Sequence, residues 1–571
     1  AVSVVISAFN ALTLSPALCA LLLRRREPPK KGFFAAFNRW FARRMDKYTA
    51  FTPTLIRHVA RTGVFIAAVL AVIFLVWRKL PAGFLPEEDQ GYVMVMVSTP
   101  EASSLQVTQK AMIRADEVIR TLPEVASTSF AAGFNMMAGI ASTDSGIIFV
   151  SLVGYSDRKL TAMEIAQKLT DELYMAVPGA ECFAFIPPSI PGLGITSGVS
   201  VEVQDLEGRG TAYLMEQSER LMDSLRKLPS VASVTTQFNA GVPQRRLRID
   251  KEQALASGVD LGVLYGDLTT LLGGAYVNNF SRFGKLYQTY IQAAPAYRMD
   301  KRSLDSYYVA SSSGESVPVS SLVEVVDTVG VEYVSQFNLY RSIGLTVTPA
   351  ARTSTTTVMQ DITRTAAQVL PDDVGTAWSG TSFQEANASK TGGLVYLLAL
   401  VFVFLALAAL YESWGLPLAI LMSVPVAVLG AVLFIGVSHL LNAFYVNDIY
   451  MQISLVMLIG LAAKNAILVV EYADRLFNEQ GASLMDAAIG AAKLRVRPII
   501  MTAFAFILGV MPLIFASGVY ATARNIMGVA LVGGMLFATL LGIFVYPALY
   551  YFVGRIGGFE RRRERKKQEQ S

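Results

Sequence analysis

Apolar residues form long uninterrupted runs near both ends of the chain and short alternating runs between them. The long runs occupy residues 1–23, 60–78, 393–411, 416–437, 450–471, 498–517 and 525–553. Each is close to or above the roughly 20 residues that a helix needs to cross the hydrocarbon core of a bilayer. We therefore predict seven membrane spans. The chain is already apolar at Ala1, so we expect the first span to be truncated, and 525–553 is long enough to cross and continue.

Three clusters of basic residues orient these spans. They lie at 24–31, 491–498 and 561–568. Lys and Arg are enriched on the cytoplasmic side of membrane proteins, so we expect all three clusters inside. Alternate crossings then place residues 80–390 outside as one large external domain. Five spans are expected within 393–553, followed by a basic cytoplasmic tail at 554–571.

A further helix is predicted between the first two spans, over residues 33–56. One face of its first half is aromatic, and the opposite face carries Arg and Lys. The aromatic-rich face comprises Phe33, Phe34, Phe37, Trp40, Phe41 and Met45. This pattern favours an amphipathic helix that lies in the inner membrane interface, and a cytoplasmic helix packed on protein is the alternative.

The external segment alternates between strand-like and helix-like periods. We expect the order strand, helix, strand, strand, helix, strand over 84–195. The same order begins again in 196–250, which includes a strand at 244–250, and resumes at 341–385 after an insert at 251–340. The fold class predicted is therefore an α-helical polytopic membrane domain plus an α+β domain of two ferredoxin-like units.

Composition favours a membrane protein over an ordinary soluble one. Hydrophobic residues make up 53% of the chain and charged residues only 16%, with a mean hydropathy of +0.44. The net charge of +5 is confined to a few clusters, so nucleic acid is not an expected partner. The two cysteines and two histidines show no metal-ligand spacing, so we expect no metal site. We find no phosphate-binding loop or hydrolase motif, so we expect neither catalytic residues nor a cofactor.

The stretch "IGLAAKNAILVVEYA" (459–473) places Lys464 and Asn465 inside a membrane span. An ammonium near the middle of a span costs roughly 2.5–3.5 kcal/mol, and such residues usually mark a pathway or a relay. Arg495 and Thr502 lie seven residues apart, on one helical face of the next span. We predict that these four residues form one polar seam. The alternative is that Lys464 snorkels to the surface, Arg495 only anchors the topology and Thr502 bonds its own helix.

Longer motifs resemble those of one transporter family. They are "LSPALCA" (14–20), "LPAGFLPEEDQGYVMVMV" (80–97), "IPPSIPGLG" (186–194), "GGAYVNNF" (273–280), "GTSFQEAN" (380–387), "LAALYESWGLPL" (407–418), "GLAAKNAILVVEYADRL" (460–476) and "LRVRPIIMTAFAFILGVMPL" (494–513). Together they cover essentially the whole chain. They resemble the C-terminal half of resistance-nodulation-division (RND) multidrug exporters, in the hydrophobe/amphiphile efflux branch whose best-known member is AcrB.

The resemblance implies spans six to twelve of a pump in the Gram-negative inner membrane, with a large periplasmic porter domain and a docking domain built partly from 251–340. It implies a homotrimer that works with a periplasmic adaptor protein and an outer-membrane channel. Such pumps exchange inward protons for outward hydrophobic or amphiphilic drugs, powered by the proton-motive force. By resemblance, Lys464 pairs with two aspartates of an N-terminal half that would precede Ala1, and Asn465, Arg495 and Thr502 surround the pair.

The same resemblance implies a drug-binding region in "STSFAAGFNMMAGIASTDSGIIF" (127–149), which is similar to the flexible loop between the family's two drug pockets. Phe134 and Phe149 match pocket phenylalanines. Ser129 and Met136 occupy two positions that are aromatic in the family, so we expect an altered substrate range. The alternative is that these are ordinary core residues, which for Phe149 is nearly as well supported.

Two other functions remain open. A protein-export accessory of the same ancestry would have a smaller external domain, so the insert at 251–340 argues against it. A metal-cation efflux pump is raised by the methionines of the external domain: Met94, Met96, Met136, Met137 and Met163. These show no repeated chelating spacing, and Met94 and Met96 are expected to share one strand face that packs inward.

Overall fold

The computed structural model describes residues 2–22, 32–57, 59–190, 192–194, 197–350 and 353–559. The chain divides into two compact units, which are described separately. The membrane unit comprises residues 1–80, 392–515 and 524–571, and the α+β unit comprises 81–391 and 516–523. The basic segments at 24–31 and 561–568, which orient the predicted spans, lie outside the described residues.

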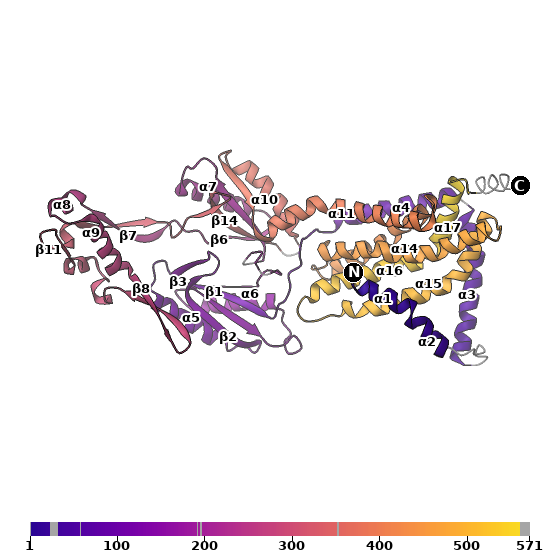
Figure 1. Ribbon diagram of the computed structural model, residues 1–571, viewed down its shortest axis with the longest axis horizontal. Helices are drawn as coiled ribbons and strands as arrows, with labels where there is room; N and C mark the ends of the chain where they lie inside the picture. Colours follow the sequence, from indigo (N-terminus) through magenta and orange to yellow (C-terminus); the bar gives the residue numbers. More distant parts are fainter. Residues whose placement is uncertain are drawn as a thin grey trace. The chain divides into compact units, whose positions relative to one another are not determined.

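The membrane unit is helical throughout its described part (Figure 1). Its helices are α1 (Val2–Leu12), α2 (Leu14–Leu22), α3 (Phe33–Ile56), α4 (Val59–Lys79), α11 (Gly380–Tyr411), α12 (Gly415–Leu421), α13 (Val424–Leu441), α14 (Ile449–Asn478), α15 (Leu484–Ile514), α16 (Ala521–Leu540) and α17 (Gly542–Ile556). Seven segments among the described residues are long and apolar enough to cross a membrane. The run at 525–553 is not one continuous helix, because Leu541 separates α16 from α17.

Small residues allow the central helices of this unit to approach closely. Ala427 of α13, Ala462 of α14 and Ala538 of α16 form one buried cluster. A Cβ atom added at Gly430 would lie 2.4 Å from the carbonyl oxygen of Gly533. The backbones of α13 and α16 are therefore nearly in contact. Membrane helices depend on such close van der Waals packing, because the hydrophobic effect does not drive helices together inside a bilayer.

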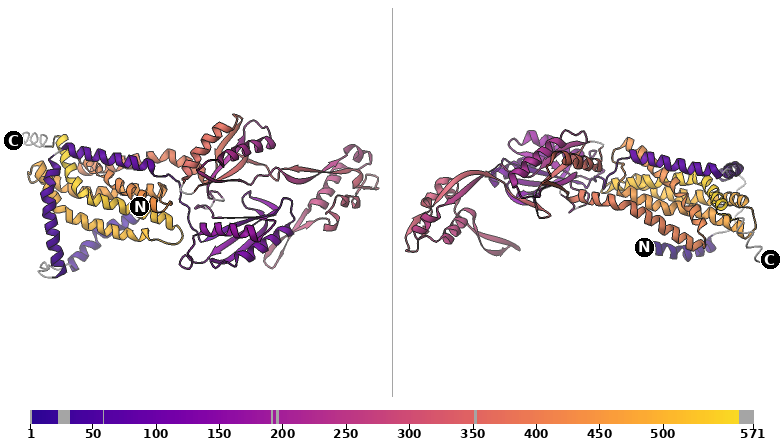
Figure 2. Two further views of the ribbon diagram at one scale, coloured as in Figure 1. Left: turned by 180° about the vertical axis from the view of Figure 1, so that it is seen from behind. Right: turned by 90° about the horizontal axis from the view of Figure 1, so that it is seen from above.

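Helix α3 crosses the ends of the other helices in its unit (Figure 2). Its second half packs on protein: the Tyr48 hydroxyl donates to the Ile543 carbonyl oxygen at 2.6 Å, and the Tyr48 ring meets Phe544 edge-on. In its first half, Phe37 and Trp40 are exposed. The side chains of Phe33 and Phe34 lie outside the described ones. Helix α3 thus combines a protein-packed half with an exposed aromatic half.

The α+β unit begins with a four-stranded antiparallel sheet in the order β2-β3-β1-β4, with two helices on one face (Figure 1). The elements are β1 (Tyr92–Ser98), α5 (Leu105–Ile119), β2 (Val125–Asn135), β3 (Ile140–Leu152), α6 (Ala162–Ala176) and β4 (Glu181–Phe185). Alternate residues of β1 define the covered face, because Val93, Val95 and Val97 are buried in a core shared with α5 and α6.

An ion pair anchors the start of β1 to the start of α6. Asp89 accepts two hydrogen bonds from the Arg158 guanidinium, both at 2.8 Å, and one each from the backbone N–H groups of Gly91 and Ala162. Ala162 is the first residue of α6, so the carboxylate also lies at the positive end of that helix. Arg158 stacks on the Tyr155 ring at 4.7 Å from its centre. The run "PEEDQ" (86–90) is therefore partly structural.

The second sheet is antiparallel in the order β13-β14-β5-β15, with β6 also paired to β14. Its elements are β5 (Val199–Asp205), α7 (Thr211–Leu225), β6 (Val231–Thr236), β13 (Ser335–Phe337), β14 (Tyr340–Pro349), α10 (Thr355–Val369) and β15 (Val374–Trp378). The strand expected at 244–250 forms as β7 (Val242–Ile249), but it pairs with β12 (Val323–Gly330). Its assignment to the second unit's sheet was wrong: it forms a ribbon that leads to the insert.

The insert has its own small core around Leu264, Leu304 and Val309. It contains α8 (Lys251–Ala256), α9 (Leu261–Leu268), β8 (Ala275–Arg282), β9 (Lys285–Ile291), β10 (Tyr308–Ala310) and β11 (Ser316–Pro318). Every residue of the hairpin β8–β9 except Ala275 is exposed, including the stacked rings of Phe280 and Tyr287.

Candidate functional site

Lys464 lies near the middle of α14, a helix of 30 residues. The helix begins after Asp448, whose buried carboxylate accepts the N–H of Met451 at 2.8 Å. The next acidic residue toward the C-terminal end is Glu471, seven residues or about 10 Å away along the axis. Lys464 is therefore deep in a span, and its side chain is exposed on the surface of this chain.

From Ile453 to Lys464, the face of α14 that carries Lys464 is otherwise apolar and has no covering element in the described chain, and Glu471 lies seven residues beyond Lys464 on the same face. Ile453, Met457 and Gly460 precede Lys464 on this face, at helical spacing, and all of them are exposed. A Cβ atom at Gly460 would meet nothing within 4 Å. Lys464 forms no ion pair with the residues that the structure describes. This exposed stripe combines close-approach geometry with one uncompensated charge.

Asn465 points elsewhere, although it is the next residue. It is only 2% exposed, and the hydroxyl of Tyr546 on α17 lies beside it. Its amide nitrogen makes no hydrogen bond to the described residues. Adjacent helical residues are about 100° apart around the axis, so Lys464 and Asn465 serve different faces of α14.

Arg495 and Thr502 of α15 are also separate from one another. The Arg495 guanidinium lies 4.8 Å from the centre of the Tyr472 ring on α14, and its buried Nε has no described partner. Thr502 is exposed, and its hydroxyl donates to the Ile499 carbonyl oxygen of its own helix at 3.1 Å. No hydrogen bond joins any two members of the predicted seam within the described residues. Of the four residues of the predicted seam, only Lys464 and Thr502 are exposed.

The predicted substrate residues Ser129 and Phe149 lie on the face of the first sheet opposite α5 and α6, where Met94 and Phe185 are buried. Ser129 on β2, Phe149 on β3, Met94 on β1 and Phe185 on β4 form one row, because each is directly opposite the next. Directly opposed residues project to the same face, which is the face away from α5 and α6. Phe149 is 40% exposed and does not belong to the main core. The segment expected as a flexible loop is thus the hairpin β2–β3.

Met136 lies in the turn of this hairpin. The turn is closed by Asn135, whose side-chain oxygen accepts the N–H of Ala138 at 3.0 Å. Met136 and Met137 pack on a buried cluster that includes Met94 and Met96. The two methionines of β1 therefore share one face and pack inward, and Met163 lies apart from them on α6. Phe134 is 39% exposed near the turn, opposite Ala141.

Phe183 is a further residue of this face that was not among the predicted substrate residues. This residue is 47% exposed on β4, and its ring stacks on that of Phe185 with the centres 5.8 Å apart. It faces the same side of the sheet as Phe149, one row further along. The alternation in "ECFAF" (181–185) was the available signal, because it places both phenylalanines opposite the buried Cys182.

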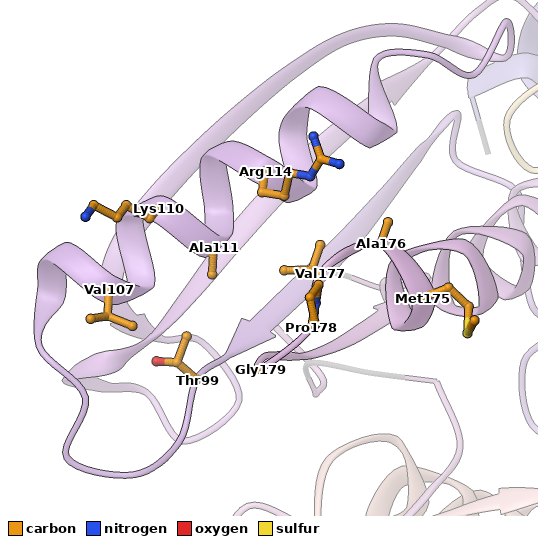
Figure 3. A pocket seen from close by; sticks show the side chains of 10 residues that line it. All are labelled: Thr99, Val107, Lys110, Ala111, Arg114, Met175, Ala176, Val177, Pro178 and Gly179. Atoms are coloured by element: carbon orange, nitrogen blue, oxygen red, sulfur yellow. The ribbon is translucent and has the colours of Figure 1, made fainter.

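The opposite, helical side of this subdomain carries a groove of about 640 Å³ between α5 and the end of α6 (Figure 3). Lys110, Arg114 and Val107 line it from α5, and Val177 and Pro178 lie on its other side. The sheet separates this groove from the row of Phe149. The groove is therefore not part of the predicted substrate face.

Comparison with known proteins identifies relatives over nearly the whole chain. The sequence profile of the AcrB/AcrD/AcrF family matches residues 1–554. The chain is 36% identical to the toluene efflux pump membrane transporter TtgB of Pseudomonas putida, over 97% of the chain and 53% of that protein. It is 34% identical to multidrug resistance protein MdtF and 33% identical to multidrug export protein AcrF, both of Escherichia coli, each over 96% of the chain and 53% of the relative. The chain thus spans about half the length of the curated relatives it matches.

Proposed function

Because the chain belongs to the AcrB/AcrD/AcrF family, we propose that it forms the C-terminal half of a proton-driven exporter of hydrophobic and amphiphilic compounds. The seven candidate spans in one unit suit proton transport, and the two antiparallel sheets in the other unit suit substrate binding. The relatives are named as toluene and multidrug transporters, which supports apolar cargo.

The observation that carries the proposal is the position of Lys464. An exposed ammonium at mid-span would cost roughly 2.5–3.5 kcal/mol against lipid. The apolar stripe of Ile453, Met457 and Gly460 beside it is shaped for a close helix contact instead. In our proposal, this stripe packs against spans that correspond to the other half of the relatives' length. Carboxylates on those spans would pair with Lys464.

Such a pair provides a proton switch. A buried carboxylate beside an ammonium stays ionised, because the opposite charge favours its charged form. Protonation of the carboxylate removes the attraction and leaves Lys464 free to move with α14. The two states then differ in the packing of α14 against its partner, which is the kind of discrete element that a transport cycle needs. Arg495 and Thr502 on the adjacent α15 would border the pair, and Asn465 would hold α14 against α17.

The substrate would contact the exposed part of the first sheet's face that lies opposite α5 and α6. Phe134, Phe149 and Phe183 offer partly exposed rings there, and Met136 offers an adaptable thioether. Ser129 lies directly beside Phe149 and replaces apolar area with a hydroxyl. We expect this site to accept aromatic and amphiphilic molecules with low selectivity, since few polar groups on the row fix an orientation.

The assembly we propose is a homotrimer in the Gram-negative inner membrane, with the α+β unit in the periplasm. An adaptor protein and an outer-membrane channel would complete the export path. The exposed aromatic hairpin β8–β9 supports a docking role for 251–340, because both of its faces require covering.

The test uses the chain within a full-length transporter, expressed with its adaptor and channel in a pump-deficient Gram-negative host. Efflux of a hydrophobic dye is followed for wild type, Lys464→Met and the control Lys493→Met, an exposed lysine of α15. We expect Lys464→Met and a protonophore each to abolish efflux, while Lys493→Met remains active at equal trimer levels. Normal efflux by Lys464→Met would show that Lys464 only reaches the membrane surface and would overturn the proposed relay.

A further inference from the structure

Glu88 holds the start of helix α16. This residue of the run "PEEDQ" (86–90) is only 2% exposed. Its carboxylate accepts the N–H of Ala523 at 2.7 Å through Oε1 and the N–H of Thr522 at 3.2 Å through Oε2. Both N–H groups belong to the first turn of α16, where a helix offers them no acceptor of its own. The negative charge of Glu88 also lies at the positive end of the helix dipole, which strengthens the attachment.

Helix α16 crosses the boundary between the two units along the chain. Residues 516–523 belong to the α+β unit and residues 524–571 to the membrane unit, yet α16 runs without a break from Ala521 to Leu540. The hydrogen bonds to Glu88 therefore lie within the α+β unit, and the remainder of the helix forms a candidate span. Because a continuous helix is a rigid element, a shift of its membrane part moves its first turn as well.

The membrane part of α16 packs tightly on α14, the helix that carries Lys464. A Cβ atom added at Gly534 would overlap Cδ1 of Leu458 on α14. Ala538 of α16 shares a buried cluster with Ala462 of α14. Contacts this close do not deform gradually, since packed helices change between discrete arrangements. A displacement of α14 therefore displaces α16.

Asp89 extends the connection into the first subdomain. Its carboxylate accepts hydrogen bonds from Arg158 and from the N–H of Ala162, the first residue of α6. Strand β1 begins three residues after Asp89 and pairs with β3, the strand of Phe149. A single peptide unit thus separates the residue that holds α16 from the residue that holds α6 and the start of β1.

We propose that Glu88 is a positioning residue that transmits movement of α16 to the first subdomain. The inference rests on the proposed function, because the proton switch on α14 is what would set α16 in motion. It adds the route: α14 moves α16, α16 moves Glu88 through two N–H groups, and Asp89 passes the movement to α6 and β1. Glu88 belongs neither to the stripe of Lys464 nor to the row of Phe149. Its loss should therefore slow export without weakening substrate binding.

The first test requires no export. Hydrogen–deuterium exchange in the first turn of α16 is measured by mass spectrometry, with the chain in a full-length transporter. Glu88→Ala should accelerate this exchange roughly five-fold, the effect of losing one N-terminal cap. Asp89→Asn should accelerate it too, but should add nothing in the Glu88→Ala background, because the connection runs through Glu88. The control Leu169→Ala destabilises the core of the same subdomain and should leave the first turn of α16 unchanged.

The second test measures dye efflux over a range of dye concentrations. Glu88→Gln preserves the size of the side chain but leaves one acceptor oxygen for two N–H groups. We expect the maximal rate to fall roughly ten-fold, the factor that one hydrogen bond to a charged group contributes, with KM and dye binding unchanged. The control Glu101→Gln removes an exposed carboxylate of the same subdomain and should export normally.

The proposal is overturned if Asp89→Asn leaves exchange in the first turn of α16 unchanged, if its effect persists in the Glu88→Ala background, or if Leu169→Ala acts equally. It is also overturned if Glu88→Gln exports like wild type, or if it weakens dye binding as much as it slows export. If wild type exports no dye, the proposed function fails, and the exchange measurement alone decides whether Glu88 links α16 to the first subdomain.

Discussion

Replacement of Asp89 by Asn should destabilise the first subdomain of the α+β unit by several kcal/mol. The carboxylate accepts four hydrogen bonds at 2.8–2.9 Å, two of them from Arg158. The Arg158 side chain is only 2% exposed, so its charge is compensated almost entirely by Asp89. An Asn side chain has one acceptor oxygen, and its NH₂ group would face the donors of Arg158. Breaking a buried pair on one side costs about 3–5 kcal/mol, and we take about 3 because Asp89 is 23% exposed.

The effect should depend on pH in a defined direction. Burial alone would raise the pKa of Asp89, but the hydrogen bonds from Arg158 and from the N–H groups of Ala162 and Gly91 outweigh it and lower the pKa. A lowered folded-state pKa contributes stability that is complete above the unfolded value of about 3.9. That contribution is lost as the pH falls through the folded-state value. The difference between wild type and Asp89→Asn should therefore shrink below about pH 4.

The assay is thermal unfolding of the full chain in detergent, with the α+β transition followed between pH 3 and pH 8. For a domain of about 110 residues, 3 kcal/mol corresponds to a decrease of roughly 10 °C or more. Asp157→Asn is the control, because it removes the same charge from a nearby carboxylate that is exposed. If the two variants unfold together, or if the difference persists unchanged in acid, the ion pair does not anchor β1 to α6.

Two further predictions concern single positions. Gly430→Ala should lower the unfolding temperature of the membrane unit, because its Cβ would lie 2.4 Å from the Gly533 carbonyl oxygen. Gly63→Ala is the control, since its Cβ would meet only a Phe552 ring carbon at 3.7 Å, and equal unfolding temperatures for the two variants would refute the close contact. Burial raises the pKa of Cys182 to about 11, so about one thiol in ten thousand is ionised at pH 7; mass spectrometry should find maleimide on Cys182 only after denaturation, and labelling of the native chain would contradict its burial.

Much of the membrane unit could be predicted from local patterns. Long apolar runs predict spans because a helix that faces lipid needs apolar side chains along its whole length. The motifs around 460–476 and 494–513 indicated the family. The family profile and the relatives confirm that resemblance. The break at Leu541 could not be predicted, because residues 525–553 are apolar on both sides of it.

The position of each polar residue required the tertiary structure. The sequence singled out Lys464, Asn465, Arg495 and Thr502, and their roles remain predictions. Sequence spacing could not show that Asn465 faces Tyr546 while Lys464 faces outward. Each helical face acquires its partner from a segment far along the chain, and no local period encodes that choice.

The sequence by itself determined most of the helices and strands, which segments are long and apolar enough to cross a membrane, and which family the motifs indicate. These properties follow from local periods of 3.6 and 2 residues and from the length of apolar runs. Only the tertiary structure decided that β7 pairs with β12, that the methionines of β1 and the β2–β3 turn meet, and that Lys464 lies on an uncovered stripe. Those outcomes depend on contacts between residues distant in sequence, where packing and not local preference selects the partner.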